Sequence, residues 1–588
     1  MPKATQHVAI IISVSIFVYF INLGGPRLWD RDEPRNAGCA IEMLEANDWI
    51  VPRFNGQVRD HKPILLYWLM MSSYALFGVS EFSARFPSAL LSVGTVLLTY
   101  SLGRRLINRD AAFWGALILS TTLMFTVAAR AATPDALLIF CVTLTLWTYV
   151  YHTFSNQANS TNEQNPLTQF YPNSWWKIAS IYAVSGLAVL AKGPVGLVLP
   201  TAIIGMFLLI MRLPVPKTSN TWAAKFLSVL RPFTPLHFLK TCWQMKPGTA
   251  LLAAALVALP WYLWVAMRDY RWIEGFFFTH NLARATTSME GHSGPPIYYP
   301  LVLCIAFFPW SVFFIPTLLE VVHTIRTKSA QYTGQIFLCC WVGVWVVIFT
   351  IASTKLPSYV TPMYPALALL TGVYIERLLK QTSAVSIRWY YAATSVFTIV
   401  GVGLIIALPI VASQYLPGEE FLGAIGVILL IGGIVAIVCQ MKQQVTLSVR
   451  AIAVSSMLFV VAMLAVATQR IDSHQQNHLL LTAIEEQTPD SPLFCYRVLE
   501  PSWIFYSGKT VKEIVGDEQD LRQLAQEKNN AVVITTSAHW QEFTEETRSQ
   551  FKILAQEPYF LKSDDLLVLF PISSEVSTAR RDNQAATK

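Results

Sequence analysis

Long apolar runs alternate with polar loops along most of this chain. Crossing a bilayer takes about 20 residues of helix. Thirteen runs approach or exceed that length, at 8–23, 84–103, 111–129, 134–153, 175–191, 194–211, 249–267, 299–318, 335–353, 358–376, 389–410, 420–440 and 451–468. A further apolar stretch, 64–79, is ambiguous, because counting it as a span would invert every later loop. The pattern predicts a polytopic α-helical membrane protein with about 13 transmembrane helices.

After residue 468 the pattern changes to short alternating segments. Strands are expected at Leu493–Val498, Ala531–Thr536 and Leu566–Pro571, and helices at Asp517–Lys528 and Ala538–Gln550. We therefore expect a membrane domain over 1–468 that includes a long catalytic loop at 24–83, a soluble α/β domain over 469–572, and a disordered tail over 573–588.

Composition supports the membrane assignment. Hydrophobic residues make up 54% and charged residues 13% of the chain, whereas soluble proteins carry about 25% charged residues. Residues 470–588 hold 12 Lys and Arg against 18 Asp and Glu, which leaves 31 of the 43 basic and 18 of the 36 acidic residues for the membrane part. The basic excess is what loops facing an anionic leaflet show, and it does not indicate nucleic-acid binding.

The same charges orient the chain. After Phe86, one set of alternate loops holds 17 Lys and Arg and the other holds six. Basic loops stay in the cytoplasm, so the N-terminus is expected inside, 64–79 on the outer surface as an interfacial helix, and the C-terminal domain outside. The first span lacks a small-residue cleavage site and is interpreted as uncleaved.

The eight cysteines show no metal-binding spacing. Cys39 and Cys495 are the pair expected outside the membrane, and a disulfide between them is left open. His280 and His292, twelve residues apart, give only weak support for a divalent metal.

Polar residues gather in or beside the outward-facing loops, where ionisable groups are costly without a reason. They come from six segments, and their convergence would build one polar cavity: Asp32, Arg35, Lys62, Asp135, Lys192, His280, Arg284, His292, Lys355 and Tyr359. Cations bind phosphates, and a carboxylate can act as a general base.

Each of these residues also has a structural interpretation. Asp32 and Asp135 can cap helices, Lys192 can snorkel from the end of a span, and Lys62 can anchor the helix after it. Tyr359 can belong to an aromatic belt, and the histidines can be solvated. No acidic partner is evident beside Lys192 in the sequence.

Four motifs resemble those of GT-C glycosyltransferases, in particular the aminoarabinose transferases and the related protein O-mannosyltransferase-like enzymes. The motifs are Leu28-Trp29-Asp30-Arg31-Asp32-Glu33-Pro34-Arg35, His61-Lys62-Pro63-Ile64-Leu65-Leu66-Tyr67-Trp68, Ala191-Lys192-Gly193-Pro194 and Lys355-Leu356-Pro357-Ser358-Tyr359. His61 stands where the aminoarabinose branch has Glu, which places an acidic role at that position in question.

The resemblance implies a GT-C fold in a bacterial inner membrane and an inverting transfer of a sugar from a polyprenyl phosphate carrier. Asp32 would be the base or orient the acceptor, and Asp135 would orient the sugar or acceptor. Lys62, Lys192 and Arg284 would stabilise the leaving phosphate with the Tyr359 hydroxyl, and Arg35 would hold Asp32 in place. The remaining substrate-binding residues are expected to be Glu33, His61, His280 and Lys355. No cofactor is required.

The sugar and the acceptor stay open. In the aminoarabinose branch the acceptor is lipid A, whose phosphate is already ionised, so Asp32 would position it; for a protein hydroxyl, Asp32 would be a true base. A transporter or flippase for lipid-linked sugars would share the spans, but no internal repeat is seen. A non-enzymatic sensor would explain residues 470–588 but not the outward-facing charges.

Overall fold

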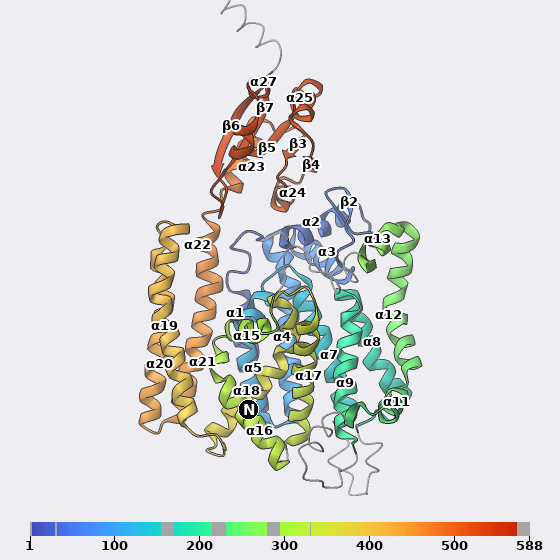
Figure 1. Cartoon of the computed structure of the whole chain (residues 1–588), viewed down its shortest axis with the longest axis vertical. Coiled ribbons are helices and arrows are strands. Elements are labelled where there is room, and N and C mark those ends of the chain that lie inside the picture. Colours follow the sequence, from blue (N-terminus) through green and yellow to red (C-terminus); the bar gives the residue numbers. More distant parts are fainter. Residues whose placement is uncertain are drawn as a thin grey trace, which may run out of the picture.

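Long helices run side by side through most of the molecule, and a smaller α/β region stands on one end of them (Figure 1). The computed structural model describes residues 3–29, 32–154, 170–213, 231–278, 294–329 and 331–572. The predicted disordered tail, 573–588, lies outside the described residues.

The membrane part is built almost entirely from helices. Its first half contains α1 (Lys3–Phe20), α2 (Asp32–Glu45), α3 (Leu65–Phe77), α4 (Glu81–Leu106), α5 (Arg109–Ser120), α6 (Leu123–Ala129), α7 (Pro134–Phe154), α8 (Trp175–Lys192) and α9 (Val195–Met211). Its second half contains η1 (Arg231–Phe233), α11 (Pro235–Gln244), α12 (Pro247–Arg268), α13 (Tyr270–Glu274), α15 (Tyr298–Ala306), η3 (Trp310–Phe313), α16 (Phe314–Thr327), α17 (Tyr332–Ile351), η4 (Pro357–Met363), α18 (Tyr364–Leu379), α19 (Arg388–Tyr415), η5 (Glu420–Ala424), α20 (Ile425–Met441), α21 (Val445–Val461), η6 (Ala462–Ala467) and α22 (Thr468–Asp472).

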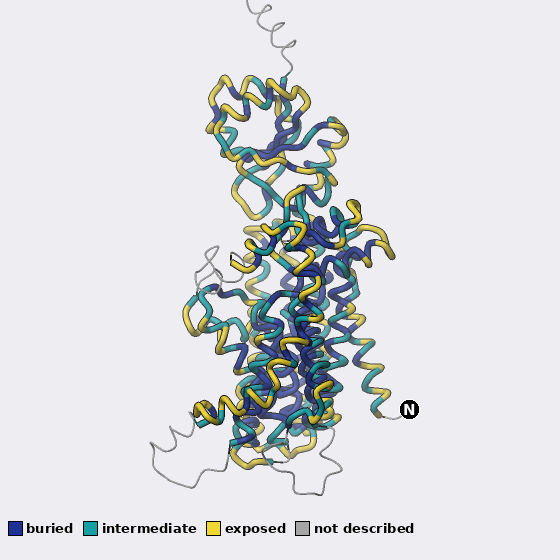
Figure 2. Tube along the Cα trace, turned by 90° about the vertical axis from the view of Figure 1, so that its right-hand side faces the viewer, coloured by how far each residue is buried: buried dark blue, intermediate teal, exposed yellow. Residues whose placement is uncertain are grey.

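Eight helices in the described residues are long and apolar enough to cross a membrane, and ten if each of two bent pairs counts as one span. The prediction of a multi-pass helical membrane protein is therefore confirmed, whereas the count of 13 spans is supported only to this extent. The other predicted spans coincide with α8, α9 and the pair η4–α18, which are shorter or less apolar. Buried residues follow the middle of the bundle (Figure 2), and exposed apolar side chains such as Leu252 and Leu256 of α12 face outward.

Two predicted spans are bent instead of straight. α5 and α6 meet at 67°, where the hydroxyls of Thr121 and Thr122 donate back to the carbonyls of Leu117 and Ile118, both at 2.8 Å. Such hydroxyls compete with the helical hydrogen bonds and bend helices. α15 and the helix over 310–327 meet at 119°, and Pro309, at the break, has no N–H to continue the helix.

A layer of short elements covers the end of the bundle that carries the α/β region. It contains α2, α3, α13 and a hairpin of β1 (Arg53–Phe54) and β2 (Gln57–Val58) (Figure 1). α3 occupies most of the ambiguous stretch 64–79, and with only 13 residues it is shorter than a span. Its place on the outer surface of the membrane stays a prediction.

The C-terminal α/β region is a five-stranded sheet with the order β4-β3-β5-β7-β6. Its strands are β3 (Leu493–Tyr496), β4 (Val511–Ile514), β5 (Val532–Thr536), β6 (Phe551–Pro558) and β7 (Asp565–Pro571), and its helices are α23 (Asn477–Gln487), α24 (Pro501–Ser507), α25 (Glu518–Glu527), α26 (Ser537–Glu542) and α27 (Glu545–Arg548). β4, β3 and β5 are parallel, whereas β7 and β6 are antiparallel additions. α23 and α24 cover one face, and α25 and α26 cover the other.

The sequence prediction for this region was correct for the three central strands and α25, and wrong for five other elements. The edge strands β4 and β6 and the helices α23 and α24 were missed. The single helix expected over 538–550 is two helices, because the Thr544 side chain accepts a hydrogen bond from the Thr547 N–H and caps a new helix, α27.

The α/β region and α22, the helix before it, contact the first loop at three points. Arg27 Nε lies 3.1 Å from a carboxylate oxygen of Asp472. The Tyr506 hydroxyl accepts from the Leu28 N–H at 2.7 Å and donates to Glu81 at 3.1 Å.

The third contact resembles the pairing of two β-strands, because one residue both donates to and accepts from the backbone of the other. The Asn55 side chain donates to the Val511 carbonyl at 2.7 Å and accepts from the Val511 N–H at 2.9 Å. Through these contacts the C-terminal region holds the loop that carries the candidate acidic motif.

Both cysteines predicted to lie outside the membrane are free and buried. Burial raises the pKa of the Cys39 thiol and that of the Cys495 thiol to about 12. The structure therefore has no disulfide between them, and both thiols stay protonated at neutral pH.

Candidate active site

Four of the predicted site residues meet beneath the C-terminal region, each at the end of a different element. Asp32 begins α2, Asp135 lies in the first turn of α7, Lys192 ends α8, and Tyr359 lies in η4. Helix ends bring side chains to the face of a bundle without interrupting its interior. Four segments up to 327 positions apart in the sequence therefore contribute to one place.

Lys192 and Asp135 form an ion pair, and each side chain is 18% exposed. The expectation that Lys192 has no acidic partner was wrong, because the partner comes from another helix, 57 residues away. The Thr133 hydroxyl donates to the second Asp135 oxygen at 3.4 Å. Lys192 Nζ also lies 5.8 Å from the centre of the Tyr359 ring, within the range of a cation–π contact.

Asp32 lies near this ion pair and near a second cation. Its carboxylate acts electrostatically on Lys192 and on Arg59, a buried residue that the sequence analysis missed. Arg59 donates to the Tyr67 hydroxyl at 3.1 Å and to the Asn36 side chain at 3.0 Å. In the described residues, the Asp32 carboxylate accepts no hydrogen bond from the start of α2, so the cap interpretation does not describe this structure.

The Glu33 carboxylate is held by contacts within the protein. It is 6% exposed, and its two oxygens accept from Arg85 at 2.9 and 2.8 Å. They also accept from the N–H groups of Trp29 at 2.9 Å and Ala132 at 2.7 Å. Glu33 thus joins the first loop to α4 and to the turn before α7, as a positioning residue beside Asp32.

Arg35 and His61 lie toward the outer rim. Arg35 lines a cavity of about 340 Å³ between α2 and the C-terminal region, together with Arg497, Glu500, Glu513 and Lys562 among others. His61 Nδ1 lies 3.0 Å from the carboxylate of Asp60. An acidic group therefore exists beside the position where His61 replaces the family's Glu, one residue earlier than expected.

Lys355 lies four residues after α17, and its side chain reaches back to the C-terminal end of that helix. It is 7% exposed, and its ammonium donates to the carbonyls of Thr350 and Ala352 at 3.0 and 2.8 Å. These carbonyls belong to the C-terminal end of α17, where a cation is favourable.

Lys62 lies in the loop directly before α3 and is half-buried. His280, Arg284 and His292 lie outside the described residues.

Arg85 and Arg130 support the site, and the sequence analysis gave neither a role. Arg130 donates to four carbonyls at the C-terminal end of α1, over residues 18–22, and to that of Leu464. A signal existed for Arg85, which stands inside an apolar span, where a charge usually has a function.

Within the described residues, no group of three or more His, Cys, Asp or Glu side chains could hold a metal ion.

The chain is similar to several known proteins. Residues 61–161 match the family model described as dolichyl-phosphate-mannose-protein mannosyltransferase. An uncharacterised protein of Aquifex aeolicus is 29% identical over 362 residues, which are 61% of this chain and 62% of that protein. The chain thus spans less than two thirds of that relative.

Relatives with a named activity are also found. The undecaprenyl phosphate-alpha-4-amino-4-deoxy-L-arabinose arabinosyl transferase of Pectobacterium carotovorum is 27% identical over 74% of this chain and 71% of its own length. The crystal structure of ArnT from Cupriavidus metallidurans bound to undecaprenyl phosphate superimposes with a TM-score of 0.75, covering 97% of this chain and 99% of that one at 20% identity.

The last match establishes the fold of nearly the whole chain. The predicted resemblance to GT-C glycosyltransferases is confirmed by these relatives, and the predicted enzyme class, glycosyltransferase, agrees with their names.

Proposed function

We propose that this protein transfers a sugar from a polyprenyl phosphate carrier to an acceptor at the face of the membrane that carries the C-terminal region. The observation that carries the proposal is the meeting of Asp32 with the Lys192–Asp135 pair and Tyr359 at that face. A lipid-linked donor keeps its phosphate at the membrane surface, and a group at one end of the apolar helix bundle suits that position.

The chemistry requires little of the protein beyond placement and charge. The acceptor oxygen attacks the anomeric carbon from the face opposite the phosphate, and the bond from that carbon to the phosphate oxygen breaks. The leaving group departs with its electron pair as a polyprenyl phosphate. Cations that stabilise the developing charge replace a protonating acid.

Lys192 can bind that phosphate while it remains paired. An ammonium has three N–H donors, and Asp135 takes one of them in this structure. Asp135 would hold the ammonium in place, and a phosphate oxygen would accept from a remaining N–H. Lys62, Arg284 and the Tyr359 hydroxyl are proposed as further phosphate contacts.

Asp32 is the proposed catalytic carboxylate, and its task depends on the acceptor. For a hydroxyl acceptor it takes the proton as the oxygen attacks. For a phosphate acceptor there is no proton to take, and Asp32 orients the acceptor.

The relatives' names favour 4-amino-4-deoxy-L-arabinose as the sugar, with undecaprenyl phosphate as the carrier. We propose lipid A as the acceptor and the periplasmic face of a bacterial inner membrane as the location, with the N-terminus in the cytoplasm. The family match over residues 61–161 supports the second candidate, transfer to a protein hydroxyl.

Asp32→Asn tests the enzyme assignment. With purified full-length protein in lipid nanodiscs and an undecaprenyl phosphate sugar, the variant should lose about 10²- to 10⁴-fold in turnover. Glu45→Gln is the matched control, because it removes an exposed carboxylate from the other end of α2. Equal activity of Asp32→Asn and wild type would overturn the role of Asp32.

A deletion strain tests the acceptor. Mass spectrometry should show loss of a sugar from lipid A if lipid A is the acceptor, and loss from envelope glycoproteins if a protein hydroxyl is. Accumulation of the lipid-linked sugar on the cytoplasmic side, with transfer unaffected in vitro, would favour a flippase instead.

A further inference from the structure

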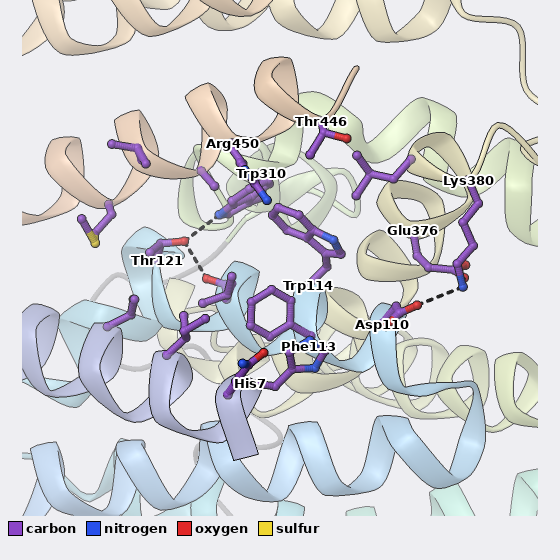
Figure 3. A pocket seen from close by; sticks show the side chains of 18 residues that line it. His7, Asp110, Phe113, Trp114, Thr121, Trp310, Glu376, Lys380, Thr446 and Arg450 are labelled. Atoms are coloured by element: carbon purple, nitrogen blue, oxygen red, sulfur yellow. Dashed lines mark hydrogen bonds and ion pairs between the residues drawn. The ribbon is translucent and has the colours of Figure 1, made fainter. Parts of the chain in front are cut away.

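A groove opens between four helices at the end of the bundle opposite the candidate active site. It has a volume of about 700 Å³ and is lined by residues of α1, α5, α18 and α21, with Trp310 of η3 at its deep end (Figure 3). None of the proposed catalytic or phosphate-binding residues lines it.

The outer end of the groove is polar. Lys380 Nζ lies 3.0 Å from Asp110 and 2.6 Å from Glu376, so this lysine and two carboxylates largely satisfy one another. Arg450, in the second turn of α21, differs from them. Among the residues that the structure describes, it has no hydrogen-bond or ion-pair partner.

Basic side chains are numerous at this end of the groove. His7 of α1 lines the groove, and its surroundings contain Lys3, Arg104 and Arg109 against a single carboxylate, Asp110. Counted together with Arg450, Lys380 and Glu376, five basic side chains lie at or near this end of the groove against two carboxylates, and this favours an anionic ligand.

The wall of the groove is apolar and partly exposed. It contains Val14, Leu117, Ala453 and Met457, while Ile10 and Val454 are 45% and 52% exposed at its edge. From Thr446 to Met457 the groove follows twelve residues of α21, and the eleven steps between them rise about 16 Å at 1.5 Å per residue. That is about half of the 30 Å hydrocarbon core of a bilayer, the depth of one leaflet.

The deep end is closed. Trp310 is buried and donates through its indole N–H to the Thr121 hydroxyl at 2.9 Å, at the bend between α5 and α6 (Figure 3). A charged mouth, an apolar wall one leaflet deep and a closed floor match a lipid with a charged head and acyl chains better than a soluble anion.

We propose that this groove binds an anionic phospholipid of the leaflet facing the N-terminal end of the chain. The phosphate lies at Arg450, whose long side chain reaches the headgroup level, and one acyl chain lies along Ile10, Val454 and Met457. The bound lipid joins α21 to α1 and α18. The site is separate from the sugar transfer and does not depend on it.

Native mass spectrometry of the full-length protein tests this site, with phosphatidylglycerol as the probe and phosphatidylcholine as the competitor. Arg450→Gln should lower retention of phosphatidylglycerol about tenfold, the loss expected when one charged hydrogen-bond partner is removed. Arg388→Gln is the matched control, since Arg388 starts α19 at the same end but does not line the groove.

A second pair of variants tests the apolar wall independently. Val454→Trp fills the groove and should abolish retention, whereas Leu447→Trp, an exposed position of the same helix outside the groove, should leave it unchanged. Retention by Arg450→Gln equal to wild type, or equal retention of the two lipids by wild type, would overturn the proposal.

Discussion

The Lys192–Asp135 pair determines how the site must be tested at the scale of single residues. Lys192→Met alone leaves a carboxylate without its cation, and Asp135→Asn alone leaves a lysine without its anchor. Each change should lower turnover by about tenfold or more, since a contact to a charged group contributes about 1.5–3 kcal/mol.

If the pair acts as a unit, the double variant should be about as active as the worse single variant and not worse by the product of the two losses. Strictly multiplicative losses would mean that the two residues act on different parts of the substrate. The measurement is turnover per correctly inserted molecule, which separates catalysis from expression.

Glu33 and Asp32 are adjacent, but we expect the Glu33 variant to lose stability and the Asp32 variant to lose activity. Glu33→Gln leaves Arg85 buried without its carboxylate, and breaking a buried ion pair costs about 3–5 kcal/mol. Thermal unfolding in detergent should show a clear loss of stability for Glu33→Gln and little change for Asp32→Asn. Normal stability with lost activity in Glu33→Gln would instead make Glu33 a substrate contact.

The polar character of the site was predictable at this scale, but its pairing was not. Asp32, Asp135, Lys192 and Tyr359 stood out because each lies in or beside a loop that is expected to face outward. The ion pair joins Asp135 and Lys192, which are 57 residues apart. A contact between positions so far apart cannot be predicted from the local sequence pattern. Arg59 was missed because it sits in a polar loop where a charge is ordinary.

At the scale of elements, the strands that are buried along their whole length are the ones that the sequence predicts. The central strands β3 and β5 are buried along their length, and their apolar runs were recognised. β4 and β6 are the two edges of the sheet. Edge strands carry exposed charges such as Lys512 and Glu513, which protect the strands from pairing with other chains. The same charges interrupt the apolar pattern by which a strand is recognised in the sequence.

The contact between Asn55 and Val511 is the element-scale feature most open to experiment. Asn55→Ala removes both hydrogen bonds between the β1–β2 turn and β4, and should increase amide hydrogen exchange in residues 53–58 and 511–514. An increase of about tenfold corresponds to 1.4 kcal/mol, near what one or two such bonds contribute.

Gln57→Ala is the control, because Gln57 lies in the same hairpin with an exposed side chain. Unchanged exchange in Asn55→Ala would mean that Tyr506 and Arg27 hold the loop without it.

For the whole molecule, the arrangement in Figure 1 makes a topology experiment simple to interpret. We expect a cysteine at Val515, which is 72% exposed, to react with a membrane-impermeant maleimide in intact spheroplasts. A cysteine at Lys442, in the turn between α20 and α21, should react only after lysis. Replacing the exposed native Cys304 by Ser reduces the background. Labelling of Lys442→Cys but not Val515→Cys in intact spheroplasts would reverse the proposed orientation.

The three contacts between the first loop and the C-terminal region have a consequence for how the protein is made. Their partners are 445, 478 and 456 residues apart. At about 5–20 residues per second, a ribosome adds the later partner roughly 20–100 s after the earlier one. During that interval the acidic loop has emerged while the segment that will hold it does not yet exist. The site can therefore be completed only near the end of synthesis, so a nascent chain stopped before the last hundred residues should be inserted in the membrane yet unable to transfer sugar.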